Sequence, residues 1–426
     1  MKGLPDNVQK YPEPSFSPRS FPWVIALLGA LLLFIVNVNG VTFGVFFKPI
    51  AEELAWSRGS VAGALAIRSL LVAVFALPTG YLADRFGPRR VLLPSCLFMG
   101  IGFLMYSKVT SMWQLYLVQG LLMGMALSAP YVCVVSTVAK WHTERPGRAL
   151  GIASAGVGLT SVLSPPIATT LIESIGWRDA MIVLGVFTIA MGVPACIVMK
   201  APSSTQAQRS GRPNQHRSPF AVWRKLPRLL NNRVFLAIVL AFLLYYTAAH
   251  LLLTHLVNYV TDIGLSPLIA GTMMTAMGIA SIIGRLGVGA ISDRMGTRVD
   301  TAMCCISVLV SLILLMLKIP LLIWIAVVLF GVGFGGMTAL VPVVVADHFG
   351  WKYLSTLTGA LMIGASSGNA LGPWIGGLVF DVSDSYFWAL ALSAALTIVA
   401  LAILMRMPSA RESRAKGQAL VESLSL

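Results

Sequence analysis

Long apolar runs recur along the chain and are separated by short polar segments. Twelve of these runs hold 17 to 27 residues each, with at most one charged side chain per run. A helix needs about 20 apolar residues to cross the hydrocarbon core of a bilayer. The pattern therefore predicts twelve membrane-spanning helices, at residues 23–47, 60–83, 91–107, 113–139, 148–172, 180–199, 234–260, 267–292, 300–317, 321–346, 356–380 and 386–405.

The two sets of six helices repeat one plan. Residues 80–90 read GYLADRFGPRR and residues 289–298 read GAISDRMGTR, so that Asp84 and Asp293 are separated by 209 residues. Pro165 and Pro373, further along the two sets, are separated by 208 residues. A constant offset is the mark of an internal parallel repeat. The predicted fold is all-α and polytopic, with 12 transmembrane helices in two pseudo-symmetric six-helix bundles.

Polar segments divide this plan into five parts. The stretch between the repeats is rich in Ser, Gln, Pro and Arg, which is typical of a linker, and a surface helix is predicted near 219–230. The first 20 residues contain four prolines and lack an apolar core, so they resemble a flexible tail rather than a signal peptide. The expected parts are an N-terminal tail 1–22, a first bundle 23–199, a linker 200–233, a second bundle 234–406 and a C-terminal tail 407–426.

Composition and charge fit a membrane protein with a defined orientation. Of 426 residues, 57% are hydrophobic and 11% charged, more apolar surface than one soluble core could hide. Of the 31 Lys and Arg residues, 24 fall on the side of the N-terminus and 5 in the opposite loops. The positive-inside rule then places both termini in the cytoplasm, in a cell membrane. The net charge of +15 follows from this topology and from anionic lipid head groups, and does not indicate nucleic-acid binding.

Several chemistries find no support in the sequence. All five cysteines lie inside predicted helices without metal-ligand spacing, which is typical of small apolar filling residues. No GxxxxGK[ST] phosphate-binding loop is present, and the soluble segments are too short for a nucleotide-binding domain. We therefore expect neither an enzyme nor a bound cofactor or metal.

The paired DRxG loops carry a family resemblance. The stretch GYLADRFGPRR resembles the loop between helices 2 and 3 of the major facilitator superfamily, and GAISDRMGTR resembles its second copy between helices 8 and 9. Gly80 allows close helix approach, and Asp84 is suited to a helix N-terminus or to pairing with Arg145 or Arg148. The resemblance implies a conformational gate. The residues expected to form it are Gly80, Asp84, Arg85, Gly87, Arg89, Arg145, Arg148, Asp293 and Arg294.

A narrower resemblance covers most of the chain. Five runs resemble the branch that contains monocarboxylate transporters and oxalate/formate exchangers: FFKPIAEELAWSRG, WHTERPGRALGIASAGVG, GWRDA, VADHFGWKYLSTLTG and GNALGPWIGGLVFD. This resemblance implies a monomeric secondary carrier that moves a small organic anion by alternating access, by proton symport or by anion exchange.

Two arginines lie within predicted helices, where a charge is costly by about 2.5 to 3.5 kcal/mol. Arg285 is eight residues before Asp293, about 12 Å from the loop and too deep to reach it comfortably. In the related carboxylate transporters a helix-8 arginine binds the substrate carboxylate, and Arg285 matches that position. Arg68 lies eight residues inside the second helix. It is either a second anion clamp, which would favour a dicarboxylate or a larger acid, or a side chain that reaches the outer interface.

Polar residues of several helices form the rest of the predicted site. Four of them recur at intervals of four in the seventh helix and share one face: Tyr246, His250, Thr254 and Asn258. In the superfamily, helices 1, 4, 7 and 10 line the pathway, which places these residues opposite Asn37, Asn39, Gln119 and Tyr131. The alternative is that the four only form hydrogen bonds between helices.

The coupling mode is left open by two departures from the family pattern. Proton-coupled relatives commonly carry an aspartate one turn before the helix-8 arginine, where this chain has Ser281. His250 is then the best titratable candidate for protons. Relatives that exchange dianions have a helix-11 lysine, where Asn369 stands.

The resulting hypothesis is a carrier for a small organic anion, most simply a monocarboxylate, with Arg285 as its anchor. One alternative is an exporter of drugs or siderophore-like compounds on the same fold, which should show an acid inside the membrane. A second alternative, a transporter-derived sensor, would need an output domain larger than residues 200–233 or 407–426.

Overall fold

A computed structural model describes residues 21–56, 58–142, 146–202, 232–350 and 354–407. The two tails, Arg145 and most of the expected linker, including the helix predicted near 219–230, lie outside these residues. In chain order the helices are α1 (Phe21–Glu53), α2 (Arg58–Phe86), α3 (Pro88–Tyr106), α4 (Met112–Leu115), the π-helix η1 (Tyr116–Leu122), α5 (Met123–Ser128), α6 (Pro130–Trp141), α7 (Pro146–Val198), α10 (Arg233–Asp262), α11 (Pro267–Met295), α12 (Thr297–Met316), α13 (Pro320–Phe349), α14 (Leu354–Ser383) and α15 (Tyr386–Arg406).

The described helices cross the molecule twelve times. Ten of them are long and apolar enough to span a membrane, the segments α4 to α6 counting as one helix. Helix α7 has 53 residues, about 80 Å of helix, and therefore makes two crossings. It turns at Gly176, where φ is +79°, a conformation that strongly favours glycine. Helix α14, with 30 residues, adds the twelfth crossing. The predicted fold class is confirmed.

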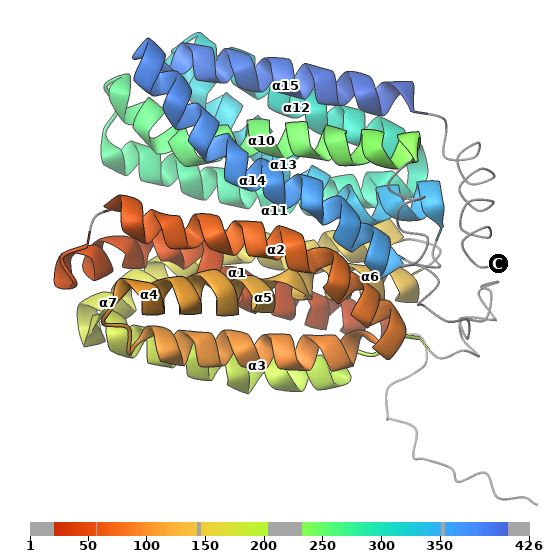
Figure 1. Ribbon diagram of the computed structural model, residues 1–426. Helices are drawn as coiled ribbons and strands as arrows, with labels where there is room; N and C mark the ends of the chain where they lie inside the picture. The colour runs from red at the N-terminus through yellow and green to blue at the C-terminus, as the bar shows by residue number, and fades with distance from the viewer. Residues whose placement is uncertain (1–20, 57, 143–145, 203–231, 351–353, 408–426) are drawn as a thin grey trace, which may run out of the picture.

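The helices form two bundles that lie side by side (Figure 1). Helices α1 to α7 make one half, and α10 to α15 make the other. Two helix pairs, α2 with α14 and α7 with α11, provide most of the contact between the halves. Helix α1 begins and α15 ends at the same end of the molecule, which we call the terminal end (Figure 1). The end at which α1 stops and α2 begins is the opposite end.

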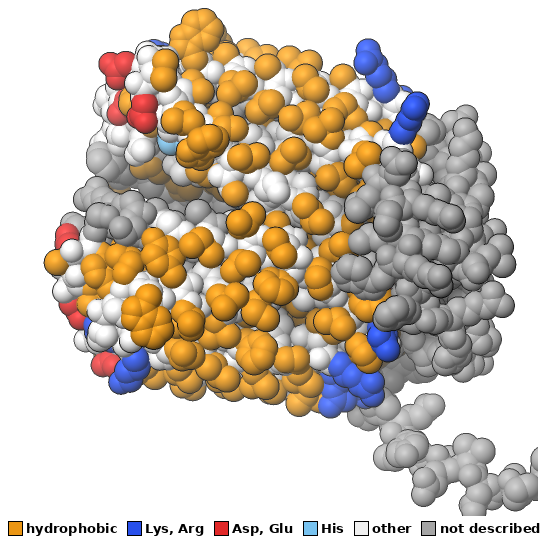
Figure 2. All heavy atoms as spheres, in the orientation of Figure 1, with side chains coloured by type: hydrophobic (Ala, Val, Ile, Leu, Met, Phe, Trp, Pro, Cys, Tyr) orange, Lys and Arg blue, Asp and Glu red, His pale blue; other side chains and the backbone are white. Residues whose placement is uncertain are grey.

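The outer surface matches a lipid environment. Figure 2 shows apolar side chains covering the middle of the molecule, with Lys, Arg, Asp and Glu gathered towards its two ends. Large apolar side chains of this band, such as Leu70, Trp374 and Ile283, are 60 to 62% exposed. A soluble monomer rarely exposes so continuous an apolar surface, whereas lipid accommodates it without cost.

The halves are closely packed at the terminal end. A Cβ atom added at Gly80 of α2 would collide with the backbone of Ser355 in α14. A Cβ atom added at Gly289 of α11 would collide with the backbone of Gly147 in α7. The structure therefore represents a state that is closed at the terminal end.

Candidate functional site

Arg285 is a buried cation at the boundary between the two halves. Its side chain is only 2% exposed, although it is among the largest in the protein. Nη1 donates hydrogen bonds to the carbonyl oxygen of Ser281, at 3.1 Å, and to the Ser281 hydroxyl, both on its own helix α11. The buried Nε has no hydrogen-bond partner among the described residues. Among the described residues, no carboxylate forms an ion pair with the guanidinium.

Side chains from both halves surround this guanidinium. Gly158 of α7 lies against it, since a Cβ atom there would be 3.4 Å from Nη1. The phenols of Tyr131, on α6, and Tyr246, on α10, interact with it electrostatically. Tyr131 also donates a 2.5 Å hydrogen bond to the carbonyl oxygen of Thr338 on α13. Arg285 and Tyr131 are thus positioned where a rocking motion of the halves would change their surroundings.

The predicted polar stripe of α10 divides into two parts. Tyr246 is buried, and its ring lies 6.2 Å from the ring of His250 at an angle of 29°. Phe334 of α13 packs against both rings, at centroid distances of 6.2 and 5.6 Å. Thr254 and Asn258, one and two turns further along, are exposed. The structure therefore brings the first two stripe residues into an aromatic cluster near Arg285 and leaves the last two outside it.

Three polar side chains of the first half form one network. The Nη1 atom of Arg68 donates to Oδ1 of Asn39 at 2.7 Å. The amides of Asn39, on α1, and Gln119, on η1, exchange two hydrogen bonds of 3.3 Å. Asn37 instead donates to the carbonyl oxygen of Leu33 on its own helix, at 2.7 Å. Arg68 thus contacts α1 and remains partly exposed.

Asn369 of α14 is a further polar group near α10. The preceding residue, Gly368, packs so tightly on α10 that a Cβ atom there would lie 3.0 Å from Cβ of Tyr246. The buried Oδ1 atom of Asn369 has no hydrogen-bond partner among the described residues. Its unsatisfied acceptor makes it a candidate for contact with a hydroxyl or amide of a cargo.

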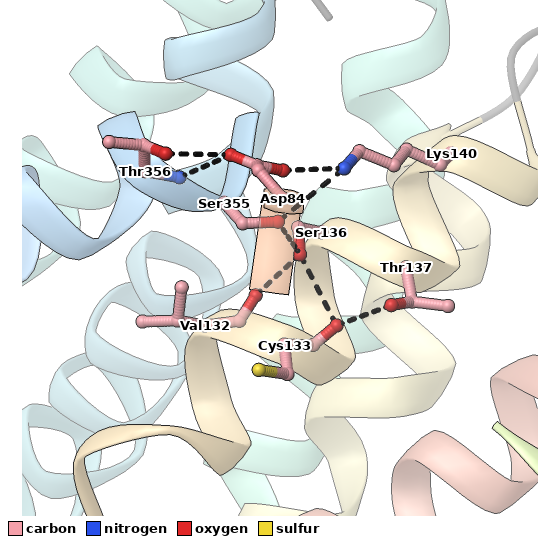
Figure 3. Close-up of polar contacts among 8 residues, drawn as sticks. All are labelled: Asp84, Val132, Cys133, Ser136, Thr137, Lys140, Ser355 and Thr356. Carbon is pink, nitrogen blue, oxygen red and sulfur yellow. Dashed lines mark hydrogen bonds and ion pairs between the residues drawn. The ribbon is translucent and has the colours of Figure 1, made fainter. Parts of the chain in front are cut away.

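The gate predicted at Asp84 is a charged contact between the halves (Figure 3). Oδ1 of Asp84 accepts a 2.8 Å ion-pair hydrogen bond from Nζ of Lys140 on α6. Oδ2 accepts 2.8 Å hydrogen bonds from the backbone N–H and the hydroxyl of Thr356, in the first turn of α14. A carboxylate at a helix N-terminus satisfies amides that have no partner in the helix and is favoured by the helix dipole. The contact therefore stabilises the state closed at the terminal end.

Serines extend this contact away from Asp84. The hydroxyl of Ser355 donates to the hydroxyl of Ser136 on α6 at 2.7 Å, and Lys140 lies 3.5 Å from Ser355 (Figure 3). Ser136 in turn donates to the carbonyl oxygen of Val132 on its own helix. The sequence predicted either a helix N-terminus or Arg145 or Arg148 as the partner of Asp84. The structure shows the N-terminus of α14 and, as the ion-pair partner, Lys140, while Arg145 lies outside the described residues. The signal available for Lys140 was its position directly after the fourth predicted helix, at the same side of the membrane as the DRxG loop.

The remaining gate residues are distributed around the helix ends. Arg148 is exposed, and Arg85 lies over the ring of Phe86, 4.9 Å from its centroid. Gly87 and Gly296 both have a φ of +86° and stand before α3 and α12, so the two DRxG turns share one backbone conformation. Arg89 lies in the first turn of α3, and Asp293 and Arg294 lie in the last turn of α11.

At the opposite end, a polar cluster that the sequence did not suggest holds one half together. The indole of Trp177 and Nε of Arg178, at 3.0 Å, both donate to the carboxylate of Glu53, which ends α1. The Nη1 atom of Arg178 also donates to the carbonyl oxygens of Ser107 and Val109. The Trp177 hydrogen bond, and to a lesser extent Arg178, lowers the pKa of the Glu53 carboxyl below its usual value.

A hollow of about 420 Å³ also lies at the opposite end, in the second half. It is lined by Tyr259, Asp262, Ile263, Lys318, Phe380, Asp384, Ser385, Tyr386 and Phe387. These residues belong to helix ends and loops, and none of them contacts Arg285. The candidate cargo site is therefore the buried region around Arg285 rather than this surface hollow.

Comparisons with known proteins agree with this architecture. The family model described as Major Facilitator Superfamily matches residues 27–369. "Monocarboxylate transporter 13" of Rattus norvegicus is 26% identical over 372 residues, which cover 86% of this chain and 84% of that protein. "Monocarboxylate transporter 12-B" of Danio rerio is 26% identical over 401 residues, 87% and 83% of the two chains. A solved structure of the E. coli fucose:proton symporter FucP superposes with a TM-score of 0.69 at 14% identity, covering 91% of this chain and 98% of its own.

Proposed function

Because the chain belongs to the Major Facilitator Superfamily, and is therefore a multi-pass membrane transporter rather than an enzyme, we propose that it is a secondary active carrier of a small organic anion. A monocarboxylate is the simplest cargo. Arg285 is proposed as its anchor, with alternating access provided by rocking of the two halves. The single observation that carries the proposal is the guanidinium of Arg285, buried at the boundary between the halves without an ion pair to any described carboxylate.

The chemistry of the site supports an anion. A guanidinium offers a planar set of N–H donors that matches the two oxygens of a carboxylate. Uncompensated burial of a charge is costly, and a bound carboxylate would offset part of that cost. The relatives named monocarboxylate transporters, at about a quarter identity over most of the chain, favour the same class of cargo. A cationic drug, the alternative cargo, would instead be repelled by Arg285.

His250 is the proposed titratable group if transport is coupled to protons. Its ring packs against Tyr246 and Phe334, and its nitrogens make no hydrogen bond to a described residue. Imidazole is a titratable ring, and its protonation would add a positive charge beside the anion site. Removal of coupling in His250→Ala, with exchange of the same cargo retained, is the expected result. Undiminished stimulation by a proton gradient in that variant would exclude this role.

The proposed setting is the cell membrane, with both termini in the cytoplasm and a single chain as the working unit. The structure would then be closed to the cytoplasm, because the terminal end is closed. Labelling of tags at either terminus, in intact and in permeabilised cells, tests this orientation. Tags that react in intact cells would reverse it.

The function is tested by uptake of labelled carboxylates into proteoliposomes, with and without a pH gradient. Uptake of at least one monocarboxylate is expected for the wild type. Arg285→Gln should lower it by about 100-fold, because loss of one partner of a buried charged contact costs about 2 to 5 kcal/mol. Arg406→Gln, at an exposed arginine in the last turn of α15, is the matched control and should transport normally. Wild-type liposomes that carry no acid, or an Arg285→Gln variant as active as the control, would overturn the proposal.

A further inference from the structure

Arg68 is the second charge inside the membrane-spanning helices, and the transport mechanism above does not use it. Its guanidinium carries five N–H donors, yet the structure gives it one hydrogen bond to a described residue, the 2.7 Å bond from Nη1 to Asn39. No described carboxylate forms an ion pair with it. Arg68 is half-buried, and the one neutral amide that holds it leaves donors free for an anion or for water.

A second group without a described partner lies within electrostatic range of Arg68. The hydroxyl of Tyr106, at the end of α3, is buried and has no hydrogen-bond partner among the described residues. The Tyr106 side chain is 2% exposed and interacts electrostatically with Arg68. A guanidinium and a phenol both present N–H or O–H donors, so an acceptor between them would satisfy both at once.

The surrounding amides fix the guanidinium without neutralising it. The Oδ1 atom of Asn39 accepts from both Arg68 and Gln119, and the two amides pair reciprocally. Both residues are buried, at 2% and 0% exposure. Gln119 lies in η1, a π-helical segment inside the fourth crossing, and such segments occur frequently at functional sites. Donors that are held in place by packed amides form a preorganised site.

From these contacts we propose that Arg68, Asn39, Gln119 and Tyr106 form a second anion site, in the first half of the protein, for one small anion. The anion is either the carboxylate of the cargo, held at a separate station, or an inorganic ion such as chloride. The Arg68 guanidinium and the Tyr106 hydroxyl bind it, and Asn39 and Gln119 position the arginine.

The depth of the two arginines shows that they act on separate anions. Arg68 lies 16 residues before Asp84, whereas Arg285 lies eight residues before Asp293. At 1.5 Å per residue, Arg68 is about 12 Å further from the terminal end than Arg285. The two carboxylates of a small diacid are only a few ångströms apart, so one such molecule does not bridge both guanidinium groups.

The experiment measures thermal unfolding of the purified, full-length protein in detergent. Sodium chloride and sodium acetate are titrated separately against the sodium salt of a bulky sulfonate buffer at constant ionic strength. Wild type, Arg68→Gln, Tyr106→Phe and Arg285→Gln are compared, with Arg406→Gln as the control. Size-exclusion chromatography shows for each variant whether it is folded before titration.

Two results support the site and distinguish its ligand. If the ligand is inorganic, chloride should raise the unfolding temperature of wild type and Arg285→Gln alike, by about 2 to 4 °C near saturation. If the site binds the carboxylate of the cargo, acetate and not chloride should raise the unfolding temperature of Arg285→Gln. In either case Arg68→Gln should lose that response, and Tyr106→Phe should need about 3- to 10-fold more anion, as expected for one lost hydrogen bond.

The site proposal is overturned if neither anion raises the unfolding temperature of Arg285→Gln. It is also overturned if a folded Arg68→Gln variant shows the same rise in unfolding temperature as Arg285→Gln. If Arg68→Gln does not fold, Tyr106→Phe decides: an unchanged anion titration overturns the proposal. Binding of the cargo carboxylate rests on the proposed carboxylate transport, whereas the chloride arm does not. Failure of liposome uptake and failure of this site are therefore separate results.

Discussion

At the terminal end, polar side chains connect the two halves: Asp84 holds the first turn of α14, and Tyr131 of α6 donates to α13. At the opposite end, the described polar contacts stay within one half, as Glu53 does with Trp177 and Arg178. Contacts between halves break when the carrier changes state, whereas contacts within a half persist. The terminal-end contacts are therefore expected to control access, and the opposite-end cluster to control stability.

The two arginines inside the membrane follow the same division. Arg285 is surrounded by Gly158 and Tyr131 of the other half, so its environment depends on how the halves are placed. Arg68 is held by Asn39 of its own half, so its environment is retained in both states. An anion at Arg285 would be exposed and enclosed in turn, whereas an anion at Arg68 would stay with the first half.

The largest effect on closure of the terminal end is expected at the close backbone contact between α2 and α14. Gly80→Val should prevent closure of the terminal end, because its side chain would collide with the Ser355 backbone. Overpacking costs about 1 to 3 kcal/mol and often more for a larger side chain, so the closed population should fall by about 100-fold. The measurement is maleimide labelling of a Ser136→Cys reporter in the closed interface, relative to protein without this reporter. Gly377→Ala, towards the opposite end, should leave the labelling unchanged; equal labelling of both variants contradicts the assignment of the closed end.

Asp84→Asn should open the terminal end to a smaller extent. The variant loses the ion pair with Lys140 and weakens the cap on Thr356. A helix cap contributes about 0.5 to 2 kcal/mol, which corresponds to a roughly 10-fold shift between the states. Faster labelling of the same Ser136→Cys reporter is the expected result. Asp381→Asn, at an exposed carboxylate on α14, is the control, and an Asp84→Asn variant that matches it would show that the ion pair does not control access.

Tyr131→Phe removes one neutral hydrogen bond between the halves, that to Thr338. Such a bond contributes about 0.5 to 1.5 kcal/mol, so a shift of about 3-fold towards the open terminal end is expected. The ring also lies near Arg285, and cargo affinity measured in the same variant separates the two roles. A change in affinity without a change in reporter labelling would place Tyr131 in the cargo site alone.

The smallest effect is expected at the opposite end, as a dependence on pH. The pKa of Glu53 is lowered, mainly by the Trp177 hydrogen bond, so its ionised form stabilises the folded protein. This stabilisation is fully present above the usual carboxyl pKa of 4.5 and is lost as the pH falls through the lowered folded-state pKa. Because Glu53 is about half exposed, we expect only a small change in unfolding temperature.

The pH effect is measured as the difference in unfolding temperature between wild type and Glu53→Gln from pH 7 to pH 3. The difference should be constant above the usual pKa and should vanish at the acid end. Glu173→Gln, at an exposed glutamate of the same end, should show no such difference. Labelling of the terminal-end reporter should be identical in all three proteins; a change in Glu53→Gln would mean that this cluster also controls access.

The sequence by itself determined the frame and the central charge. Apolar runs long enough to cross a bilayer predict the twelve crossings, because a chain without water must satisfy its backbone hydrogen bonds within helices. The repeated DRxG loops predict the two halves. Arg285 stood out because a charge deep in an apolar run requires a reason. These features are local, so they can be read from neighbouring positions.

Only the tertiary structure decided which residues meet. Lys140 rather than a loop arginine pairs with Asp84, and Thr356 completes the contact from 272 residues away. Arg68 contacts Asn39 of α1, and Asn258 falls outside the aromatic cluster. Helical periodicity gives the face of each residue but not the rotation and depth of neighbouring helices. Those depend on side-chain packing across the whole bundle, which no single segment encodes.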